Sequence, residues 1–452
     1  MPRITQRWVL KTAASDGYTV HQRTIHTEEA LLANNIKHRS YINYKLNYGL
    51  RYSPQRETNR VTVPRQPAVV HSDNHTEIAN LKPVKPKPFS AGANTLAYYD
   101  HTEPPLLSLF NIISFANTPC TPRRVPVTGL TGICYREQEC RQRNGLTMDV
   151  CAGGFGVCCV FKFGCDGQTE QNISYFYASL SSPANINTVA RCSGTVKLHR
   201  HVRQVLLEFV LFELLPPQQG NCREDRFLIS VQNSNRVYPV LCGINTGQHM
   251  YLDIDAAYSQ QLSLMAISNA KQAYGTLLVK ITQFAHPKSP ADCLQFHDGL
   301  QGVVKSFNYD DYSTIVKNVK PSYLNNLNYA ICIERQNQFC SVVFRNENVL
   351  GQENSFQIVN IAPDGSSLVP ANQAGVEILS CPNDFIAINY LRLCGERLND
   401  GSIVADFTVN APVSYTIAGP VVIAVQTDDT IVGRGFKLLF NQNICINKLA
   451  DG

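Results

Sequence analysis

Short apolar or alternating runs, each bounded by glycine, proline, asparagine or aspartate, recur along the chain from residue 195 onward. They lie at 195–198, 205–215, 227–231 and 277–282, and again at 329–333, 341–344, 385–388, 421–425 and 435–440. Short runs with turn residues between them and no long helical period predict antiparallel β-sandwiches. A break falls at 286–290, where two prolines and a lysine separate one set of strands from the next. The pattern therefore predicts an all-β chain with two sandwiches.

The first 104 residues lack this pattern. They contain no cysteine and carry 14 lysines and arginines against 8 aspartates and glutamates. So polar a segment buries too little apolar surface to offset its chain entropy, and we expect residues 1–104 to be disordered. Within this segment, 27–37 is compatible with a short helix and 82–88 with a polyproline-like form. The apolar run 106–115 then predicts the first strand of a small domain.

Composition narrows the class of protein. The 452 residues are 44% hydrophobic and 17% charged, which fits globular domains over most of the length. A net charge of +5 without long like-charged runs argues against nucleic acid as a partner. No apolar stretch reaches the length of about 20 residues that spans a membrane, so we expect no transmembrane segment. The first residues are basic but have no apolar core, and we expect the signal peptide to be missing from this chain.

Sixteen cysteines divide the chain more sharply than any other residue type. None precedes Cys120, six fall between Cys120 and Cys159, and ten more are spread from Cys165 to Cys445. An even number in this arrangement predicts a disulfide framework, which persists in oxidising surroundings. We therefore expect an extracellular protein. By counting alone, the six clustered cysteines allow about fifteen connectivities.

The six clustered cysteines close on an adjacent pair, which is an unusual spacing. The motif runs from Cys120 through Gly-Ile-Cys-Tyr at 132–135 to Cys-Ala-Gly-Gly-Phe-Gly-Val-Cys-Cys at 151–159. This spacing resembles the clip domain of arthropod extracellular proteases and of their non-catalytic relatives. The resemblance implies a clip-like disulfide domain over 105–160. It also implies the bonds Cys120–Cys158, Cys134–Cys151 and Cys140–Cys159. We favour a purely stabilising role for these bonds, since so small a domain needs them for its core.

A second motif occupies 161–288. It contains four cysteines, and the last of them is followed directly by Gly243. A Phe-Glu-Leu strand at 212–214 precedes the third and fourth cysteines. These features resemble a CUB domain, an extracellular β-sandwich with two disulfides. The resemblance implies the bonds Cys165–Cys192 and Cys222–Cys242.

Residues 289–447 resemble a second, divergent CUB domain. Cys381-Pro-Asn-Asp and Cys394-Gly repeat the paired motif, and 421–438 resembles the closing strand, acidic loop and Gly-Phe strand of the family. The resemblance implies the bond Cys381–Cys394. The fold implied is all-β, with two CUB-like antiparallel β-sandwiches preceded by a small disulfide-rich clip-like domain and a disordered N-terminal segment.

Four cysteines of this last region have no fixed partner from the motif. They can pair in three ways. We favour Cys293–Cys332, because this bond would correspond to the first disulfide of the CUB family. The two remaining cysteines would then form Cys340–Cys445.

Acidic residues at the family's calcium positions define the candidate metal sites. The resemblance implies Glu213 and Asp225 in the first unit and Asp384 and Asp428 in the second, with Glu377 as a guess for the missing early glutamate. Calcium needs several hard oxygen ligands from different loops, and two carboxylates for each site would bind weakly. The alternative is that these are solvated surface acids and that the protein has no cofactor.

Catalytic signatures are lacking from the sequence. There is no His-Glu-x-x-His segment, no Gly-x-Ser-x-Gly elbow and no P-loop, and the closest histidine pair, His199 and His201, has no third ligand. A serine protease would have to follow the clip-like motif, and a CUB-like segment follows instead. We therefore predict that the protein is not an enzyme. Two sequons, Asn74-His-Thr and Asn172-Ile-Ser, predict glycosylation, with Asn172 the better candidate.

The order of a clip-like knot and two CUB-like units resembles secreted arthropod CUB-domain proteins. We predict a secreted, non-catalytic binding protein that recognises an extracellular protein or glycan. Binding would use loops such as 245–249, 305–311 and 428–430, because loops on rigid sandwiches present variable contacts. Two alternatives stay open: a non-catalytic regulator of clip-protease cascades, or a structural component of matrix.

Overall fold

The computed structural model describes residues 114–123, 130–180, 190–270, 275–313, 320–346 and 355–445. The expected disordered segment 1–104, with its possible helix at 27–37 and its proline-spaced run at 82–88, lies outside these residues. Most of the strand expected at 106–115 lies outside them too. Within the described part of the chain, no helix is long and apolar enough to cross a membrane.

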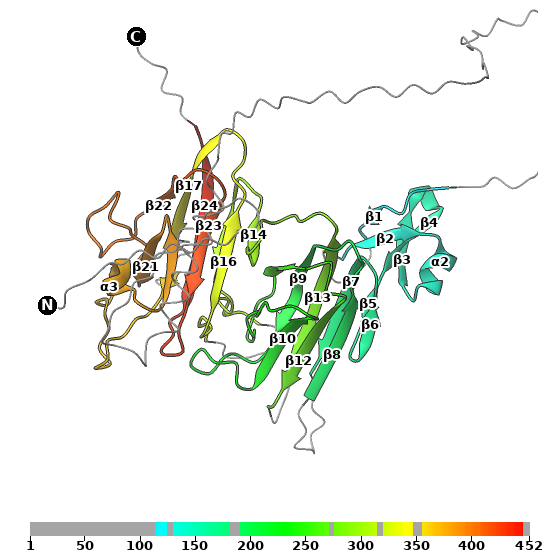
Figure 1. The fold of residues 1–452 in the computed structure, drawn as a ribbon, viewed down its shortest axis with the longest axis horizontal. Helices are drawn as coiled ribbons and strands as arrows, with labels where there is room; N and C mark the ends of the chain where they lie inside the picture. The colour runs from blue at the N-terminus through cyan, green and yellow to red at the C-terminus, as the bar shows by residue number, and fades with distance from the viewer. Residues whose placement is uncertain are drawn as a thin grey trace, which may run out of the picture. The chain divides into compact units, whose positions relative to one another are not determined.

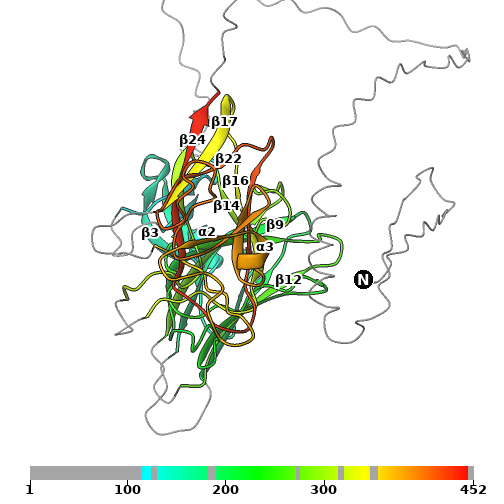
Figure 2. The same ribbon diagram turned by 90° about the vertical axis from the view of Figure 1, so that its left-hand side faces the viewer.

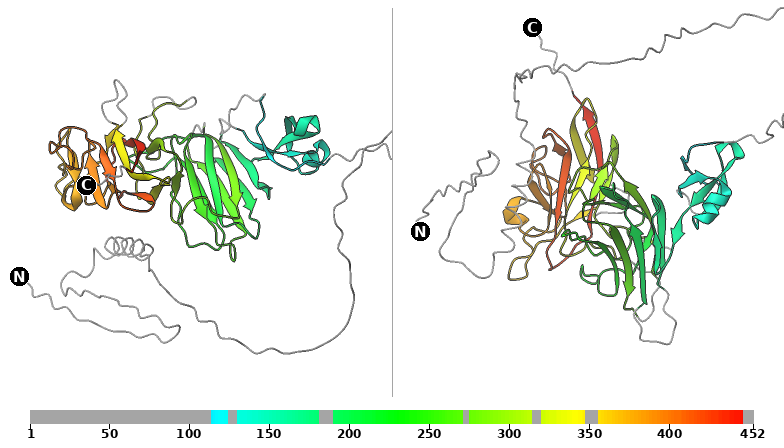
Figure 3. Two further views of the ribbon diagram at one scale, coloured as in Figure 1. Left: turned by 90° about the horizontal axis from the view of Figure 1, so that it is seen from above. Right: turned by 45° about the vertical axis from the view of Figure 1, so that its right-hand side comes forward.

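The disulfide-rich segment at 119–160 forms one small sheet with two short helices. Its strands pair in the order β1-β2-β4-β3. Their bounds are β1 Pro119–Cys120, β2 Gly132–Tyr135, β3 Leu146–Cys151 and β4 Gly156–Val160, and the helices are α2 Glu137–Gln142 and η1 Ala152–Gly154. The core is minimal: Tyr135 packs edge-to-face on Phe161 at 6.1 Å, over the buried Cys140 and Cys159. We call this segment the knot; its chain continues directly into the first sandwich, as the cyan ribbon shows in Figure 3.

Two sheets form the first sandwich, drawn in green in Figure 1. A four-stranded sheet has the order β10-β12-β8-β6, and a five-stranded sheet has the order β11-β9-β13-β7-β5. The bounds are β5 Lys162–Phe163, β6 Gly167–Thr169, β7 Ile173–Ser179, β8 Ala190–Lys197, β9 Gln204–Glu213, β10 Asp225–Val231, β11 His249–Asp253, β12 Gln261–Ser268 and β13 Thr276–Phe284. Alternate residues of the long strands are buried, as expected for sheets with one face on a core.

The second sandwich follows in yellow to red. Its six-stranded sheet has the order β14-β16-β23-β20-β21-β19, and its other sheet has the order β15-β24-β17-β22, with β18 also paired to β24. The bounds are β14 Gln295–His297, β15 Gln301–Lys305, β16 Asn328–Ile333, β17 Phe339–Asn346, β18 Phe356–Gln357, β19 Ala374–Val376, helix α3 Glu377–Ser380, β20 Phe385–Ile388, β21 Leu391–Gly395, β22 Val413–Tyr415, β23 Val421–Gln426 and β24 Gly435–Ile444. Figure 2 shows β17 and β24 side by side, as their pairing requires.

The two sandwiches share one strand order. The path β10-β12-β8-β6 of the first corresponds to β20-β23-β16-β14 of the second, and β11-β9-β13-β7 corresponds to β22-β17-β24-β15. One parallel pair is shared as well, because β6 runs parallel to β8 and β14 runs parallel to β16; the parallel pair β5–β7 occurs in the first sandwich alone among the described strands. Shared topology to this level indicates two copies of one fold. The predicted fold class of two CUB-like β-sandwiches is confirmed.

Eight disulfides stabilise the described chain, and they join the same cysteines that the sequence paired. The three bonds of the knot are Cys120–Cys158, Cys134–Cys151 and Cys140–Cys159. The first sandwich has Cys165–Cys192 and Cys222–Cys242, and the second has Cys293–Cys332, Cys340–Cys445 and Cys381–Cys394. The structure thus contains the favoured one of the three pairings left open at Cys293, Cys332, Cys340 and Cys445.

Strand β14 connects the two sandwiches through its main chain. The N–H of Tyr251 in β11 donates to the carbonyl of Leu294 at 2.8 Å, and the N–H of Leu294 donates to the carbonyl of Ala330 in β16 at 3.0 Å. The segment that starts the second sandwich therefore also bonds to the edge strand of the first. Buried apolar residues from Phe163 to Phe440 form one cluster that includes both sandwiches. Residues on either side of the 286–290 break therefore belong to one packed body.

Candidate functional site

Asp384 and Asp428, the candidate pair in the second sandwich, are in direct contact. The main-chain N–H of Asp428 donates to Oδ1 of Asp384 at 2.6 Å, and the hydroxyl of Tyr323 donates to Oδ2 at 2.7 Å. Burial, reinforced by the nearby carboxylate of Asp384, raises the pKa of Tyr323, so the phenol stays protonated and donates. Asp428 in turn accepts the N–H and hydroxyl of Thr430 through Oδ1. The two carboxylates thus fix the turn that follows β23.

Asp225 and Glu213, the candidate pair in the first sandwich, accept hydrogen bonds from different parts of the molecule. Asp225 is 1% exposed, and its Oδ2 accepts the N–H of Leu215 at 2.9 Å. Burial raises the pKa of Asp225, against hydrogen bonds from Leu215 and from the Ser268 hydroxyl. Glu213 instead accepts the hydroxyl of Ser313, a residue of the second sandwich, at 2.8 Å. The strand partner of Asp225 is Ser268, so the residue opposite Asp225 on the neighbouring strand has no carboxylate.

The fit to calcium follows from these contacts. Donors occupy both oxygens of Asp384 and one of Asp428, and each sandwich has one candidate oxygen that is buried with no hydrogen-bond partner among the described residues, Oδ1 of Asp225 and Oδ2 of Asp428. Glu377 lies exposed on α3. Calcium takes about six to eight oxygens, and no group of three or more His, Cys, Asp or Glu in the described ranges could hold a metal ion. In this arrangement the residues do not fit a calcium cage, and they act as acceptors for buried donors.

Two of the three loops expected to bind a partner face each other inside the molecule. Asn245 and Asn308 are both fully buried, with the N–H of Asn308 donating to Oδ1 of Asn245 at 2.8 Å and the N–H of Ile244 donating to Oδ1 of Asn308 at 3.0 Å. The amide of Gln248 adds a bond to the carbonyl of Ser306 at 3.2 Å. The expectation that 245–249 and 305–311 are exposed binding loops is therefore wrong. Their polar groups satisfy one another across the contact between the sandwiches. In the third loop, 428–430, Asp429 and Thr430 are exposed and Asp428 is buried.

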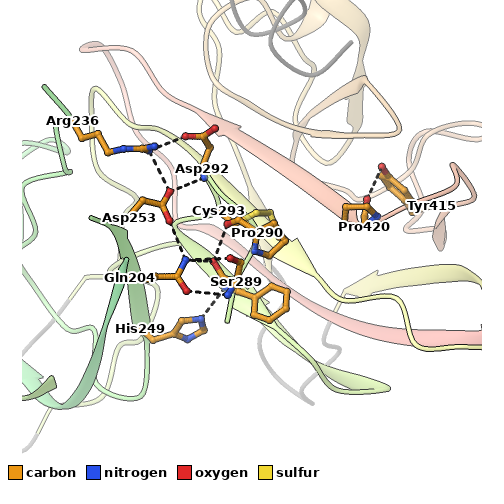
Figure 4. The surroundings of a disulfide bond; sticks show 12 residues. Gln204, Arg236, His249, Asp253, Ser289, Pro290, Asp292, Cys293, Tyr415 and Pro420 are labelled. Atoms are coloured by element: carbon orange, nitrogen blue, oxygen red, sulfur yellow. Dashed lines mark hydrogen bonds and ion pairs between the residues drawn. A yellow bond between two sulfur atoms is a disulfide. The ribbon is translucent and has the colours of Figure 1, made fainter. Parts of the chain in front are cut away.

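A second polar network holds the segment between the sandwiches (Figure 4). Gln204 of β9 is fully buried; its Oε1 accepts the N–H groups of Lys288 and Ser289 at 2.8 and 3.0 Å, and its Nε2 donates to Asp253 at 3.0 Å. Asp253 also accepts the N–H of Asp292 at 2.9 Å. A buried amide that binds the main chain of a connecting segment removes the freedom a linker would have. We call the contacts made by Asn245, Asn308, Gln204 and β14 the junction.

Two histidines meet at the junction. His249 of the first sandwich and His297 of the second lie with ring centroids 5.1 Å apart, and Nε2 of His249 accepts the N–H of Phe296 at 3.0 Å. Burial lowers the pKa of His249, and burial and the neighbouring His249 lower the pKa of His297 to about 4. Both rings are therefore neutral at pH 7, as an accepting Nε2 requires. Sequence reasoning missed this pair, because its members are 48 positions apart and only the tertiary fold brings them together.

The remaining candidate residues lie at the surface. His199 and His201 are exposed in the turn between β8 and β9 and do not lie on a strand. Asn172 is exposed just before β7, where its carbonyl accepts the N–H of Gln283 at 2.9 Å. An exposed asparagine at a turn is accessible to a glycan. Asn74 lies outside the described residues.

The chain is a tandem β-sandwich with eight disulfides, and this number of disulfides fits an extracellular protein. Residues 290–443 match the family model of the animal CUB domain. The second sandwich is therefore similar to the animal CUB domain, and the first sandwich repeats its strand order. No curated protein gave a significant match to the chain.

Solved structures similar to the chain include the CUB1-EGF-CUB2 domain of human MASP-1/3, with 15% identity and a TM-score of 0.21, covering 59% of this chain and 99% of that one. The CUB1-EGF-CUB2 domains of rat MASP-1 have 14% identity and a TM-score of 0.20, with coverages of 62% and 99%. The full extracellular region of zebrafish Gpr126/Adgrg6 has 12% identity and a TM-score of 0.22, with coverages of 62% and 34%. None of the three assigns a function to this chain.

Proposed function

We propose that the protein is a secreted, non-catalytic binding protein whose two CUB-like sandwiches recognise an extracellular protein or glycan as one rigid body. CUB domains generally mediate protein binding in extracellular proteins and are typically non-catalytic, which supports the proposal through the match at 290–443. Eight disulfides with no free cysteine suit an oxidising compartment. The proposed domains are a clip-like unit at 105–160 and CUB-like units at 161–288 and 289–447.

The observation that carries this proposal is the junction. A flexible pair of modules would place few buried polar groups between them, whereas here Gln204, Asn245 and Asn308 are each 0% exposed. Such networks fix a single arrangement when every member is satisfied. A rigid pair loses little conformational entropy on binding, which favours recognition of one large surface over two independent contacts.

The finer parts of the proposal rest on single residues. We expect one glycan at Asn172, and Asn74 is the second candidate. Calcium at Asp384 and Asp428, or at Glu213 and Asp225, would require the donors now bound to these carboxylates to move away. Calcium titration of the full chain that leaves the melting temperature unchanged would exclude such a site.

Expression of the full chain behind a secretory leader tests the proposal. We expect secretion, eight mapped disulfides, a mobility change at Asn172 on deglycosylation, and reproducible binding to members of arrays of extracellular proteins and glycans. Reduced and alkylated protein is the control and should bind none of them. Turnover of a hydrolase substrate that one Ser or His substitution abolishes, or secreted protein with no partner on either array, would refute it.

A second function, regulation of clip-protease cascades, is favoured by one feature of the knot. Strand β3 is an edge strand with Leu146, Met148 and Val150 on alternate positions, and these side chains are 47%, 38% and 70% exposed. Phe155 is 60% exposed nearby in sequence. Exposed apolar residues on an edge strand are typical of a protein contact. Activation rates of clip proteases measured with wild-type protein and with a Met148→Lys variant would distinguish this role, since only the wild type should change them.

A further inference from the structure

A groove of about 430 Å³ lies on the outer face of the five-stranded sheet, beside the junction. Leu206, Glu208 and Val210 of β9 and His249 and Tyr251 of β11 line it, and Phe296 of the second sandwich completes it. Both sandwiches therefore build the groove. Its volume is in the range of sites that accept a small ligand or a single large side chain, about 300–1,000 Å³.

The walls of the groove are aromatic. Tyr251 and Phe296 pack edge-to-face at 6.0 Å, and His249 lies edge-on to Tyr251 at 5.6 Å. The hydrogen bond from the N–H of Phe296 to His249 at 3.0 Å holds Phe296 in place and requires a neutral imidazole. The lining thus contains aromatic faces with no positive charge from histidine at neutral pH.

One carboxylate, that of Glu208, lines the groove. Its ion-pair partner is Lys280, whose Nζ lies 2.8 Å from Oε2 of Glu208, and the Lys280 side chain is only 15% exposed against 39% for Glu208. Burial, and then the carboxylates of Asp298 and Glu208, raise the pKa of Tyr251 to about 12, so its phenol is neutral at pH 7. Among the described residues that line the groove, Glu208 is therefore the charged one, and it is the more exposed member of its ion pair.

We propose that this groove binds a lysine or arginine side chain of a protein partner, with the cation at Glu208 and its carbon chain against Tyr251 and Phe296. Cations are attracted to aromatic faces and to carboxylates, and a long aliphatic stem suits apolar walls. The inference deepens the proposed binding function and rests on it for the nature of the partner. It uses neither the Asp384–Asp428 pair nor a metal.

Binding of short capped peptides to the full chain tests the assignment. The probes are acetylated, amidated pentaglycines with a central lysine, arginine or glutamine, followed by heteronuclear NMR titration. We expect the lysine and arginine peptides to bind and the glutamine peptide not to bind. Glu208→Gln and Tyr251→Leu should each weaken binding about tenfold, a change of about 1.4 kcal/mol. Asp429→Asn, on the exposed loop of the second sandwich, is the matched control and should change nothing.

One variant has the opposite expected sign. Lys280→Gln removes the ammonium that competes for Glu208, so it should strengthen binding of the lysine peptide, which a merely structural role of the ion pair would not do. Equal binding of the lysine and glutamine peptides, or an equal loss in Asp429→Asn, would overturn the assignment. A partner found on the arrays whose affinity is unchanged by Glu208→Gln would refute the groove and leave the binding function standing. Peptide binding in the groove without any partner on the arrays would support the groove and refute the proposed binding function.

Discussion

The first and second sandwiches have one strand order but are stabilised differently. The first has two disulfides and keeps Asp225 in a desolvated site, whereas the second has a third bond, Cys340–Cys445, and surrounds Asp384 with donors. The difference teaches that the topology does not depend on one set of stabilising contacts. Both copies keep two equivalent bonds: Cys165–Cys192 corresponds to Cys293–Cys332, and Cys222–Cys242 corresponds to Cys381–Cys394.

The largest expected effect comes from removing the bond that only the second sandwich has. Because Cys340–Cys445 closes a loop with a sequence separation of 105 and Cys381–Cys394 one of 13, loop entropy makes the first worth more. We expect Cys340→Ser/Cys445→Ser to lower the free energy of unfolding by about 4 kcal/mol and Cys381→Ser/Cys394→Ser by about 3 kcal/mol. Urea unfolding without reductant measures both. A smaller loss in the first variant would mean that the extra bond is redundant.

A single added methyl group, at Gly243, should disrupt the junction. Gly243 has φ +72°, and a Cβ at this position would lie 1.9 Å from Oδ1 of Asn308, whereas Gly247, with φ +81°, faces open space. Both substitutions pay the same left-handed backbone cost, but only Gly243→Ala displaces a buried amide. We expect a loss of about 3 kcal/mol for Gly243→Ala and about 1 kcal/mol for Gly247→Ala.

Thermal unfolding and limited proteolysis at 286–290 read out this pair of variants. Gly243→Ala should expose the connecting segment to protease, because its effect passes through the junction. If Gly247→Ala were cut equally fast, a backbone effect alone would explain the result.

The buried acids test whether the two copies use carboxylates in the same way. Asp384 accepts two strong donors, so Asp384→Asn should cost about 2 kcal/mol at pH 7. Asp225 has a pKa raised by burial, so its charge is already unfavourable, and Asp225→Asn should change stability by less than about 0.5 kcal/mol. Chemical denaturation at pH 7 measures both. Equal losses would show that the two sites are equivalent.

Acid should affect both sandwiches together through the histidine pair. The folded-state pKa values of His249 and His297 lie below the unfolded value of about 6.5, so the stability that these groups contribute is complete above that pH. It is lost as the pH falls from about 6.5 towards about 4, because the unfolded chain binds protons first. Between pH 7 and 4.5, we expect wild type to lose about 1–2 kcal/mol more than His297→Phe, measured by urea unfolding. Parallel curves would contradict the role of the pair.

Strand positions and disulfides were accessible to sequence reasoning because their signals are local. The run at 227–231 became β10, and the Cys-Gly at 242–243 marks a bond and a left-handed turn. The junction was not accessible. Asn245 and Asn308 have the polar, turn-forming character of exposed loops, and only the partner across the contact makes their burial favourable. The three-residue strand β14 also gives no local signal in the sequence, because it pairs in parallel with β16, whose residues lie 36 positions further along the chain.

The order of synthesis gives β14 a further consequence. When residues up to 284 have left the ribosome, the first sandwich has all its own strands but leaves the outer edge of β11 unpaired at Tyr251. Leu294 satisfies that edge only later, and the second sandwich cannot close until β24, near the end of the chain, supplies the partner of both β15 and β17. Through this interval an open edge is a template for another nascent chain. The vulnerable species in biosynthesis is thus a finished first half that awaits Leu294 of the second.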